Sequence, residues 1–229
     1  MTEPYYSDEQ VTLYHGRCEE IAEWLAADVL VTDPPFGRGW KQGGGMPTPG
    51  RRAKGIGRNG IAGDKDTTVR DTALTLWGAD RIGIVFGDLM LTPPAGTKQV
   101  LVMGKPGDAG TRGAMNGWRR DVEAIYLVGP WPSGIGGRSS ILTTRARIQG
   151  SEHGLAGRYG HPHAKPVDVM EELIRTCPDG VIADPFAGAG STLIAARNLG
   201  HHAIGVELEE KYCEAAARRL SQATFPIGA

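Results

Sequence analysis

The chain has 229 residues, a formal net charge of −1 at pH 7, 40% hydrophobic residues and 22% charged residues. This length fits one α/β domain with a large insertion at most, and the composition is that of an ordinary soluble protein. The sequence has no apolar run of the ~18 residues that a membrane helix needs, and residues 1–6 do not resemble a secretory signal. We therefore expect a cytoplasmic protein without a membrane partner.

The three cysteines, Cys18, Cys177 and Cys213, are odd in number and widely separated. This spacing excludes a disulfide framework and a zinc knuckle, and it fits a reducing compartment. His161 and His163 are near each other, but no cysteine or carboxylate cluster accompanies them. We therefore expect no metal site.

The first elements form a strand–helix–strand unit. Residues 11–15 alternate as a strand, residues 18–25 place apolar side chains at helical spacing, and residues 28–32 form a short β-branched run. Such a unit predicts a parallel crossover.

The second strand stops at Asp33-Pro34-Pro35-Phe36. Proline can neither extend a ladder nor continue as a helix, so the turn should present Asp33 and Phe36 at the carboxyl end of a strand, where open α/β sheets bind ligands. Asp33 and the Pro34 carbonyl are suitable acceptors for the hydrogens of a flat, weakly nucleophilic amine, and Phe36 could stack on a base taken out of a duplex. The alternative is a surface loop built from turn-forming residues.

Residues 37–70 break the periodicity with ten glycines and with eight Lys or Arg against two Asp, a local net charge of +6. A loop this long is usually functional or disordered. We expect the basic, glycine-rich loop at 37–66 to contact a phosphate backbone, although a solvated loop without a partner has the same composition. The candidate DNA-binding residues are Arg38, Lys41, Arg51, Arg52, Lys54 and Arg58.

The middle of the chain predicts a helix at 67–77 and strands at 81–86, 97–103 and 121–127. Consecutive strands without an intervening helix indicate an antiparallel hairpin at one edge of the sheet. Two interpretations fit Trp118, Arg119 and Arg120. All three could contact DNA, but we favour a buried Trp118 with the two arginines as a solvated rim. Residues 130–160 are an irregular insertion suited to target selection.

The last part alternates helix and strand: a helix starting at Pro166 and ending near residue 175, a strand at 180–183, a helix at 191–198, a strand at 202–206 and a helix at 209–220. Gly188 and Gly190 lie between a strand and a helix, and Glu207 ends the next strand nineteen residues after Gly188, where it can bind two ribose hydroxyls. Position 193, where a dinucleotide fingerprint has its third glycine, is Leu193. A nucleoside without phosphates, such as S-adenosylmethionine, is therefore favoured over NAD.

Four segments together closely resemble the β-group amino DNA methyltransferases, in the order typical of that group: Asp33–Phe36, His161-Pro162-His163-Ala164-Lys165-Pro166, Asp184–Thr192 and Gly205-Val206-Glu207. The resemblance extends from residue 11 to about residue 220. Within this group, the chain is most similar to the small solitary enzymes of bacteriophages and prophages. It implies a Rossmann-like α/β methyltransferase fold, with a mostly parallel sheet and an antiparallel hairpin at one edge, spanning residues 1–229.

The resemblance also implies an enzyme that methylates the exocyclic amine of a flipped base in double-stranded DNA, with S-adenosylmethionine as donor and S-adenosylhomocysteine as product. An aspartate in the first motif favours N6 of adenine over N4 of cytosine. The implied catalytic residues are Asp33, Pro34, Pro35 and Phe36. The implied cofactor-binding residues are Lys165, Asp184, Phe186, Gly188, Gly190, Ser191, Thr192 and Glu207.

Two places in the chain depart from the family pattern. The family often has Thr-Gln where this chain has His163-Ala164, and an acid where Arg17 follows Gly16. A catalytically inactive DNA-binding homologue is therefore an alternative. An NAD-dependent oxidoreductase could use the same Gly188 turn and Glu207, and a methyltransferase acting on RNA or protein glutamine could use a similar Asp33 turn, so these two are alternatives as well. The recognition sequence, a possible homodimer and a possible partner endonuclease are not encoded in any pattern of the chain.

Overall fold

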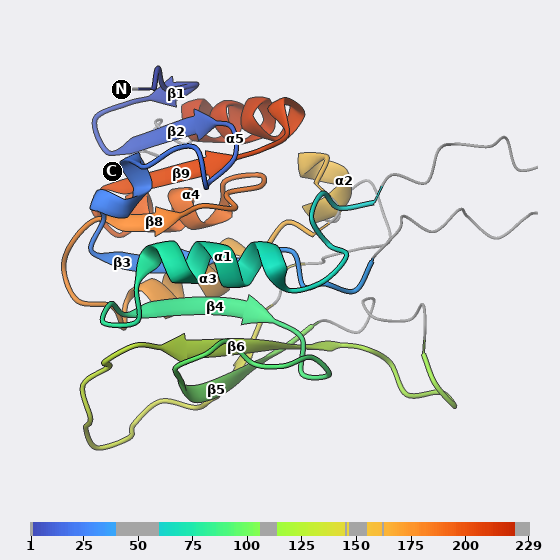
Figure 1. The fold of residues 1–229 in the computed structure, drawn as a ribbon. Helices are drawn as coiled ribbons and strands as arrows, with labels where there is room; N and C mark the ends of the chain where they lie inside the picture. The colour runs from blue at the N-terminus through green and yellow to red at the C-terminus, as the bar shows by residue number, and fades with distance from the viewer. Residues whose placement is uncertain are drawn as a thin grey trace, which may run out of the picture.

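The computed structural model describes residues 2–39, 60–105, 114–144, 146, 155–161 and 163–222. These residues form a nine-stranded mixed sheet of order β1-β2-β9-β8-β3-β4-β6-β5-β7, with helices on both faces (Figure 1). The strands are β1 (Tyr6–Ser7), β2 (Val11–His15), β3 (Val29–Thr32), β4 (Gly83–Gly87), β5 (Thr97–Gly104), β6 (Val122–Val128), β7 (Ile141–Thr143), β8 (Ile182–Asp184) and β9 (Ala203–Glu207). The helices are the 3-10 helix η1 (Glu23–Ala26) and the α-helices α1 (Thr68–Trp77), α2 (Leu155–Tyr159), α3 (Val167–Ile174), α4 (Ser191–Asn198) and α5 (Glu210–Gln222).

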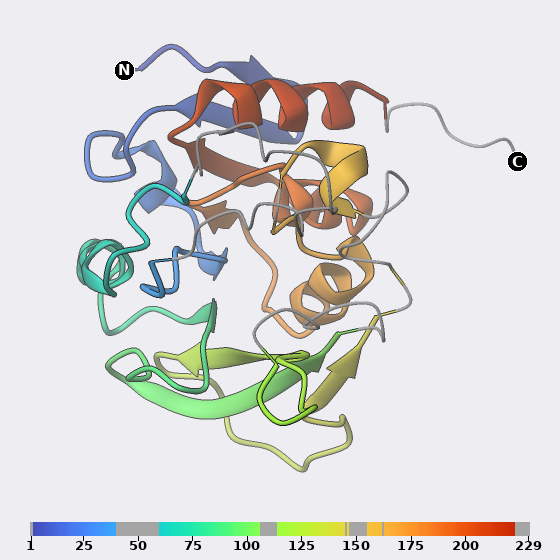
Figure 2. The same ribbon diagram turned by 90° about the vertical axis from the view of Figure 1, so that its right-hand side faces the viewer.

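Strands β2, β9, β8, β3 and β4 run parallel to one another. Their carboxyl ends therefore lie along one edge of the sheet, on the right in Figure 1 and facing the viewer in Figure 2. β6 is antiparallel to β4, so β6 begins at this same edge. The mostly parallel sheet and the antiparallel β5–β6 pair confirm the predicted Rossmann-like fold class.

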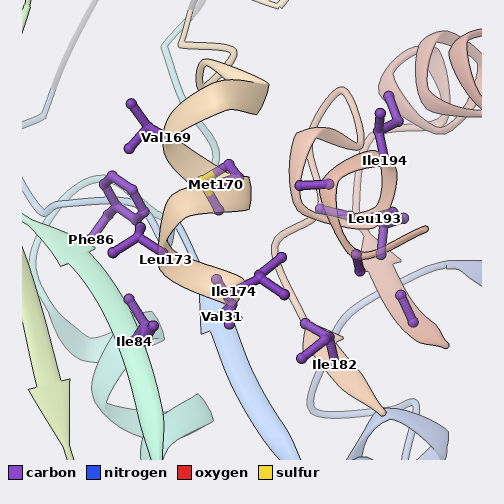
Figure 3. Close-up of a cluster of buried hydrophobic side chains, with 14 of the residues drawn as sticks. Val31, Ile84, Phe86, Val169, Met170, Leu173, Ile174, Ile182, Leu193 and Ile194 are labelled. Atoms are coloured by element: carbon purple, nitrogen blue, oxygen red, sulfur yellow. The ribbon is translucent and has the colours of Figure 1, made fainter. Parts of the chain in front are cut away.

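Alternating side chains of the central strands divide the core between the two faces. Val31 of β3 and Phe86 of β4 belong to the cluster under α3, α4 and α5, whereas Leu30 belongs to the cluster under η1 and α1. Strands buried on both faces are expected in a parallel sheet covered by helices. Figure 3 shows the first cluster, in which Met170 and Leu173 of α3 pack against β3 and β4.

Several elements differ from the prediction. The helix predicted at 18–25 is wrong: the apolar spacing there serves a turn and the 3-10 helix η1, in which Trp24 is buried and its Nε1 donates to the Cys18 carbonyl at 2.9 Å. The strands β1 and β7 and the short helix α2 were not predicted. The β5–β6 hairpin does not form the edge, because β7 pairs parallel to β5 outside it. Pro166 caps α3 and does not begin it.

Trp118 is not part of the core. Its side chain is 81% exposed on a turn between β5 and β6. No helix in the described ranges combines the length and the apolar character that crossing a bilayer requires.

Candidate active site

The Asp33 turn and the Asp184 turn are neighbours because β3 and β8 are adjacent parallel strands. Thr32 Oγ1 donates a hydrogen bond to Asp184 Oδ1 at 2.7 Å and ties the two turns together. Pro34 is buried, and Phe36 is partly buried against the core under α3. β9 follows β8 in the sheet, so Asp33, Asp184 and Glu207 all lie at the same edge, as predicted.

The carboxylate of Asp33 has two different environments. Oδ2 accepts a hydrogen bond from the Nζ of Lys165, which precedes α3. Oδ1 is buried and has no hydrogen-bond partner among the described residues. A buried carboxylate oxygen without a donor costs free energy unless a ligand supplies one. One face of Asp33 is thus held by the protein, and the other is available to a hydrogen-bond donor.

Lys165 belongs to a chain of four charges. Its Nζ lies 3.5 Å from Glu123 Oε2 of β6, and Glu123 Oε1 accepts a hydrogen bond from Lys105 Nζ at 3.2 Å. The Lys165 Nζ also lies 5.3 Å from the ring centroid of Phe36. Glu123 was not predicted from the sequence, although a single acid in the otherwise apolar run of β6 is a signal for it.

Burial controls the ionisation of these groups. It raises the pKa of Asp33 to about 6, because the attraction of Lys165 offsets only part of the desolvation and Glu123 adds repulsion. Burial also disfavours the charged forms of Lys165 and Glu123. For Lys165, the carboxylates of Asp33 and Glu123 outweigh the effect of burial and raise the pKa. For Glu123, the charges of Lys165 and Lys105 outweigh the effect of burial and lower the pKa. Above about pH 6 Asp33 and Glu123 are therefore two carboxylates bridged by the ammonium group of Lys165.

The glycine turn after β8 has the backbone conformation that glycine allows. Gly188 and Gly190 have φ angles of +50° and +77°, in the left-handed region. A Cβ on Gly188 would lie 3.1 Å from His161 Nε2, and one on Gly190 would lie 3.0 Å from the Cβ of Ala216 in α5. The turn therefore brings bare backbone to the carboxyl end of β8.

Glu207 is 8% exposed at the end of β9. Its Oε2 accepts from the Gly188 N–H at 2.8 Å, and its Oε1 accepts from the Glu209 N–H at 2.7 Å. Each oxygen keeps a second lone pair for a hydroxyl donor. Burial raises the pKa of Glu207 above its ordinary value.

The remaining predicted cofactor residues surround this turn with mostly internal bonds. Asp184 Oδ1 accepts from the Phe186 N–H at 3.1 Å as well as from Thr32. Ser191 Oγ accepts from Arg219 Nη1 at 3.2 Å, and Thr192 is buried. Asp184 thus orders the two turns through internal hydrogen bonds. The sequence alone did not distinguish this structural role from direct contact with a ligand.

Of the six candidate DNA-binding residues, only Arg38 is described. Its Nε pairs with Asp88, a buried carboxylate after β4. Asp64 holds the turn that leads to Arg38, since Asp64 Oδ1 accepts hydrogen bonds from the Gly37 N–H at 2.7 Å and from the Arg38 N–H at 3.2 Å. Lys41, Arg51, Arg52, Lys54 and Arg58 lie outside the described residues.

The two histidines are neutral near pH 7. Burial, with a smaller contribution from Lys165 and other neighbouring cations, lowers the pKa of His161 to about 3 and that of His163 to about 4. The His161 Nδ1 accepts from the His163 N–H at 3.2 Å. Across the described ranges, no three His, Cys, Asp or Glu side chains are grouped as metal ligands.

The two departures from the family pattern have ordinary surroundings. The Gly16 N–H donates to the Glu207 carbonyl at 2.9 Å, so Arg17 follows directly on the strand end beside Glu207. The Arg17 Nη2 lies 3.2 Å from Glu19 Oε1 and is thus engaged with a neighbour. Ala164 is buried between His163 and Lys165.

Comparisons with known proteins agree with this geometry. Residues 115–218 match the N6_N4_Mtase family, described as DNA methylase. The Type II methyltransferase M.ScaI of Streptomyces caespitosus is 40% identical over 73 residues, which are 31% of this chain and 24% of that protein. The match spans less than a third of the length of the curated relatives.

Two solved structures share the fold. The complex of M1.HpyAVI with SAM has a TM-score of 0.61 at 20% identity and covers 92% of this chain and 98% of the other. The PvuII DNA methyltransferase, described as cytosine-N4-specific, has a TM-score of 0.62 at 15% identity and covers 100% of this chain and 91% of the other. The family match over residues 115–218 and the curated relative confirm the predicted resemblance to the β-group amino DNA methyltransferases, and the two solved structures share the fold of this chain.

Proposed function

We propose that this protein transfers a methyl group from S-adenosylmethionine to the exocyclic amine of a base flipped out of double-stranded DNA. The observation that carries the proposal is the carboxylate of Asp33. One of its oxygens is held by Lys165, and the other is buried without a donor, at the same sheet edge as the glycine turn and Glu207. An amine hydrogen would supply the missing donor.

In this proposal the Asp33 turn binds the base. Asp33 Oδ1 accepts one amine hydrogen, and the Pro34 carbonyl accepts the second, so that the nitrogen lone pair is freed from the ring. Pro35 stiffens the backbone of the turn, and Phe36 stacks on the base. Lys165 keeps the Asp33 carboxylate oriented throughout.

The residues around Gly188 fit the nucleoside donor. Gly188 and Gly190 let the turn take its left-handed backbone close against His161 and Ala216, and the second lone pairs of Glu207 beside this turn can accept ribose hydroxyls. Phe186, Ser191 and Thr192 surround the turn, and Lys165 lies toward the methionine end. Leu193 is fully buried in the core, where a dinucleotide-binding turn would have glycine.

When bound, S-adenosylmethionine supplies a methyl group on a positively charged sulfonium, which is already a good leaving group. The protein then has two tasks, orienting the amine in line with the methyl carbon and taking up the proton that the amine loses. Asp33 is suited to both, since its raised pKa lets it hold a proton that the solvent later removes. Positioning is the larger share of the work.

Among the two family substrates we favour N6 of adenine. The motif begins with Asp33, which the resemblance associates with adenine, and N4 of cytosine is the alternative. The fold does not discriminate between them, because a described cytosine-N4-specific enzyme shares it. We further propose that Arg38 and the basic loop at 37–66 bind the phosphate backbone, and that residues 130–160 contribute to target selection.

The test is expression in a bacterial host that lacks its own DNA methyltransferases, followed by single-molecule sequencing of the host DNA. The expected result is a methylated adenine in one sequence context, absent from cells that express Asp33→Ala. An unmodified genome from cells containing folded wild-type protein would contradict the proposal. Binding of S-adenosylhomocysteine and of NADH to the purified protein would then separate an inactive homologue from an oxidoreductase.

A further inference from the structure

A hydrogen-bonded turn carries two large apolar side chains into solvent between β5 and β6. The segment Ala114–Asp121, here called the 114–121 turn, contains a two-residue reversal at Asn116 and Gly117, whose φ angles are +48° and +85°. The Met115 N–H donates to the Trp118 carbonyl at 3.0 Å, and the Trp118 N–H donates to the Met115 carbonyl at 2.9 Å. Asn-Gly with both φ angles positive is the tightest hairpin turn, so the tip is preorganised.

The exposed residues of the tip are the ones a folded protein normally buries. Trp118 is 81% exposed and Met115 is 70% exposed. Tryptophan has more apolar area than any other side chain, and neighbouring exposed apolar side chains are candidates for a binding surface. The two hydrogen bonds between Met115 and Trp118 hold the backbone that presents both side chains.

The position of the turn links it to the proposed active site. β6 begins at the carboxyl-end edge of the parallel strands, and the turn projects from that edge, at the right in Figure 1 and toward the viewer in Figure 2. Lys105 N donates to the Asp121 carbonyl at 2.7 Å and closes the base of the turn. Glu123, which binds Lys165, follows Trp118 by five residues, so at most about 17 Å of extended chain separate them.

The charges around the turn favour an anionic partner. Arg120 is exposed, and it lies close enough to Arg38 to lower the pKa of Arg38, with burial as the larger cause. Two neighbouring guanidinium groups repel each other unless an anion lies between them. Arg38 is anchored on Asp88, so Arg120 is the partner able to move toward a phosphate.

We propose that the 114–121 turn is a DNA wedge, in which Trp118 and Met115 enter the base stack at the position vacated by the flipped base while Arg120 and Arg38 bind the adjacent phosphate. This inference rests on the proposed function and deepens it. Apolar wedges that occupy an unstacked step are a known way for proteins to hold distorted DNA. The wedge would stabilise the flipped state, and the Asp33 turn would receive the base.

The first experiment compares methyl transfer by Trp118→Ala, Trp118→Phe and Leu76→Ala. Leu76 is 43% exposed near the end of α1, which leads to the amino end of β4 at the opposite edge of the sheet, so its replacement removes exposed apolar area away from the site. The substrates are a paired duplex that carries the context found by sequencing, and the same duplex with the target base mispaired. Mispairing lowers the cost of flipping, which a wedge otherwise offsets.

For Trp118→Ala we expect kcat/KM on the paired duplex to fall about tenfold or more, and on the mispaired duplex to fall about threefold or less. Trp118→Phe should retain most of the rate, because it still stacks, and Leu76→Ala should match the wild type. Equal rates for Trp118→Ala and wild type, or an equal loss on both duplexes, would overturn the wedge.

A second readout does not depend on turnover. Titration with a short duplex should quench the fluorescence of Trp118 by base stacking, measured as the difference between the wild type and Trp118→Phe. Quenching without any methyl transfer would support the wedge and reject the proposed activity. Binding of duplex without a Trp118 signal would reject the wedge, whether or not transfer occurs.

Discussion

Asp33 must be ionised to accept an amine hydrogen, yet burial raises its pKa to about 6. The protonated form predominates below this pH and offers one acceptor fewer. We therefore expect kcat/KM for methyl transfer to rise by about one log unit per pH unit up to about pH 6 and to level off above it. A rate profile measured from pH 5 to pH 8.5 at constant ionic strength checks this.

The control is Asp33→Asn, which keeps the shape of the side chain but cannot ionise. Its transfer rate should be at least about a hundredfold lower, without an acid limb, whereas binding of S-adenosylhomocysteine should be unchanged. A wild-type profile that is flat through pH 6 would show that ionisation of Asp33 does not limit the reaction.

Glu123 offers a second prediction, because it acts on Asp33 through Lys165 and through charge repulsion. Glu123→Gln removes a negative charge that raises the pKa of Asp33, so the acid limb should move to lower pH. Lys165 also loses one of its anchors, and we expect the rate at pH 8 to fall roughly threefold to tenfold. Glu172→Gln, an exposed change on α3, should leave both quantities unaltered. An unshifted acid limb in Glu123→Gln would exclude Glu123 as a positioning residue.

These contacts also mark what the sequence could predict for single residues. The Asp33 turn was predictable because two prolines stop a β-branched strand. Lys165 was expected near the cofactor, but its ion pair with Asp33 joins residues 132 positions apart and depends on how α3 packs. The roles of Glu123 and Asp64 depend on such long-range placement as well.

At the scale of single elements, Gly190 and Gly200 separate two costs of adding a side chain. One is the cost of a left-handed backbone conformation, and the other is the cost of a steric clash with a neighbouring helix. Gly190→Ala would force alanine into the left-handed region and place its Cβ 3.0 Å from the Cβ of Ala216. Gly200 has a similar φ of +83°, but an added Cβ there meets nothing within 4 Å. We expect Gly200→Ala to lower the free energy of unfolding by about 1 kcal/mol, and Gly190→Ala by about 1–3 kcal/mol more.

Urea unfolding of the two variants measures this difference. Equal losses would mean that α5 moves away from the turn without cost. A larger loss in Gly190→Ala, with weakened binding of S-adenosylhomocysteine, would show that close packing of α5 on the turn shapes the cofactor site.

Elements with a strong local signal were predicted, and those without it were not. α3, α4, α5 and the central strands have clear apolar periodicity or buried runs, and their predicted ranges agree with the structure to within two or three residues. β1, β7 and α2 contain two, three and five residues, too few to show a period. The helix predicted at 18–25 had the right spacing, but its residues bury Trp24 through η1 instead.

At the scale of the whole molecule, the sheet joins two halves of the chain that are distant in sequence. The Asp33 turn comes from the first 40 residues and the glycine turn from the last 50, and the site exists only because β8 inserts between β3 and β9. The sequence order of the motifs allowed this arrangement to be expected. The exposure of Trp118 could not be predicted from the sequence, since an isolated tryptophan beside arginines is compatible with a buried position or an exposed one.

Because the proposed cofactor site lies at the ends of β8 and β9, which stand between β2 and β3 in the sheet, a ligand bound there should stabilise the entire fold. At a free concentration of one hundred times its Kd, S-adenosylhomocysteine should add about 2.7 kcal/mol to the free energy of unfolding. For a protein of this size we expect Tm to rise by about 5–10 °C. NADH at the same concentration should leave Tm unchanged, since Leu193 occupies the position of the third glycine that a pyrophosphate requires. A differential scanning measurement with both ligands decides this, and a rise with NADH alone would favour an oxidoreductase on the same sheet.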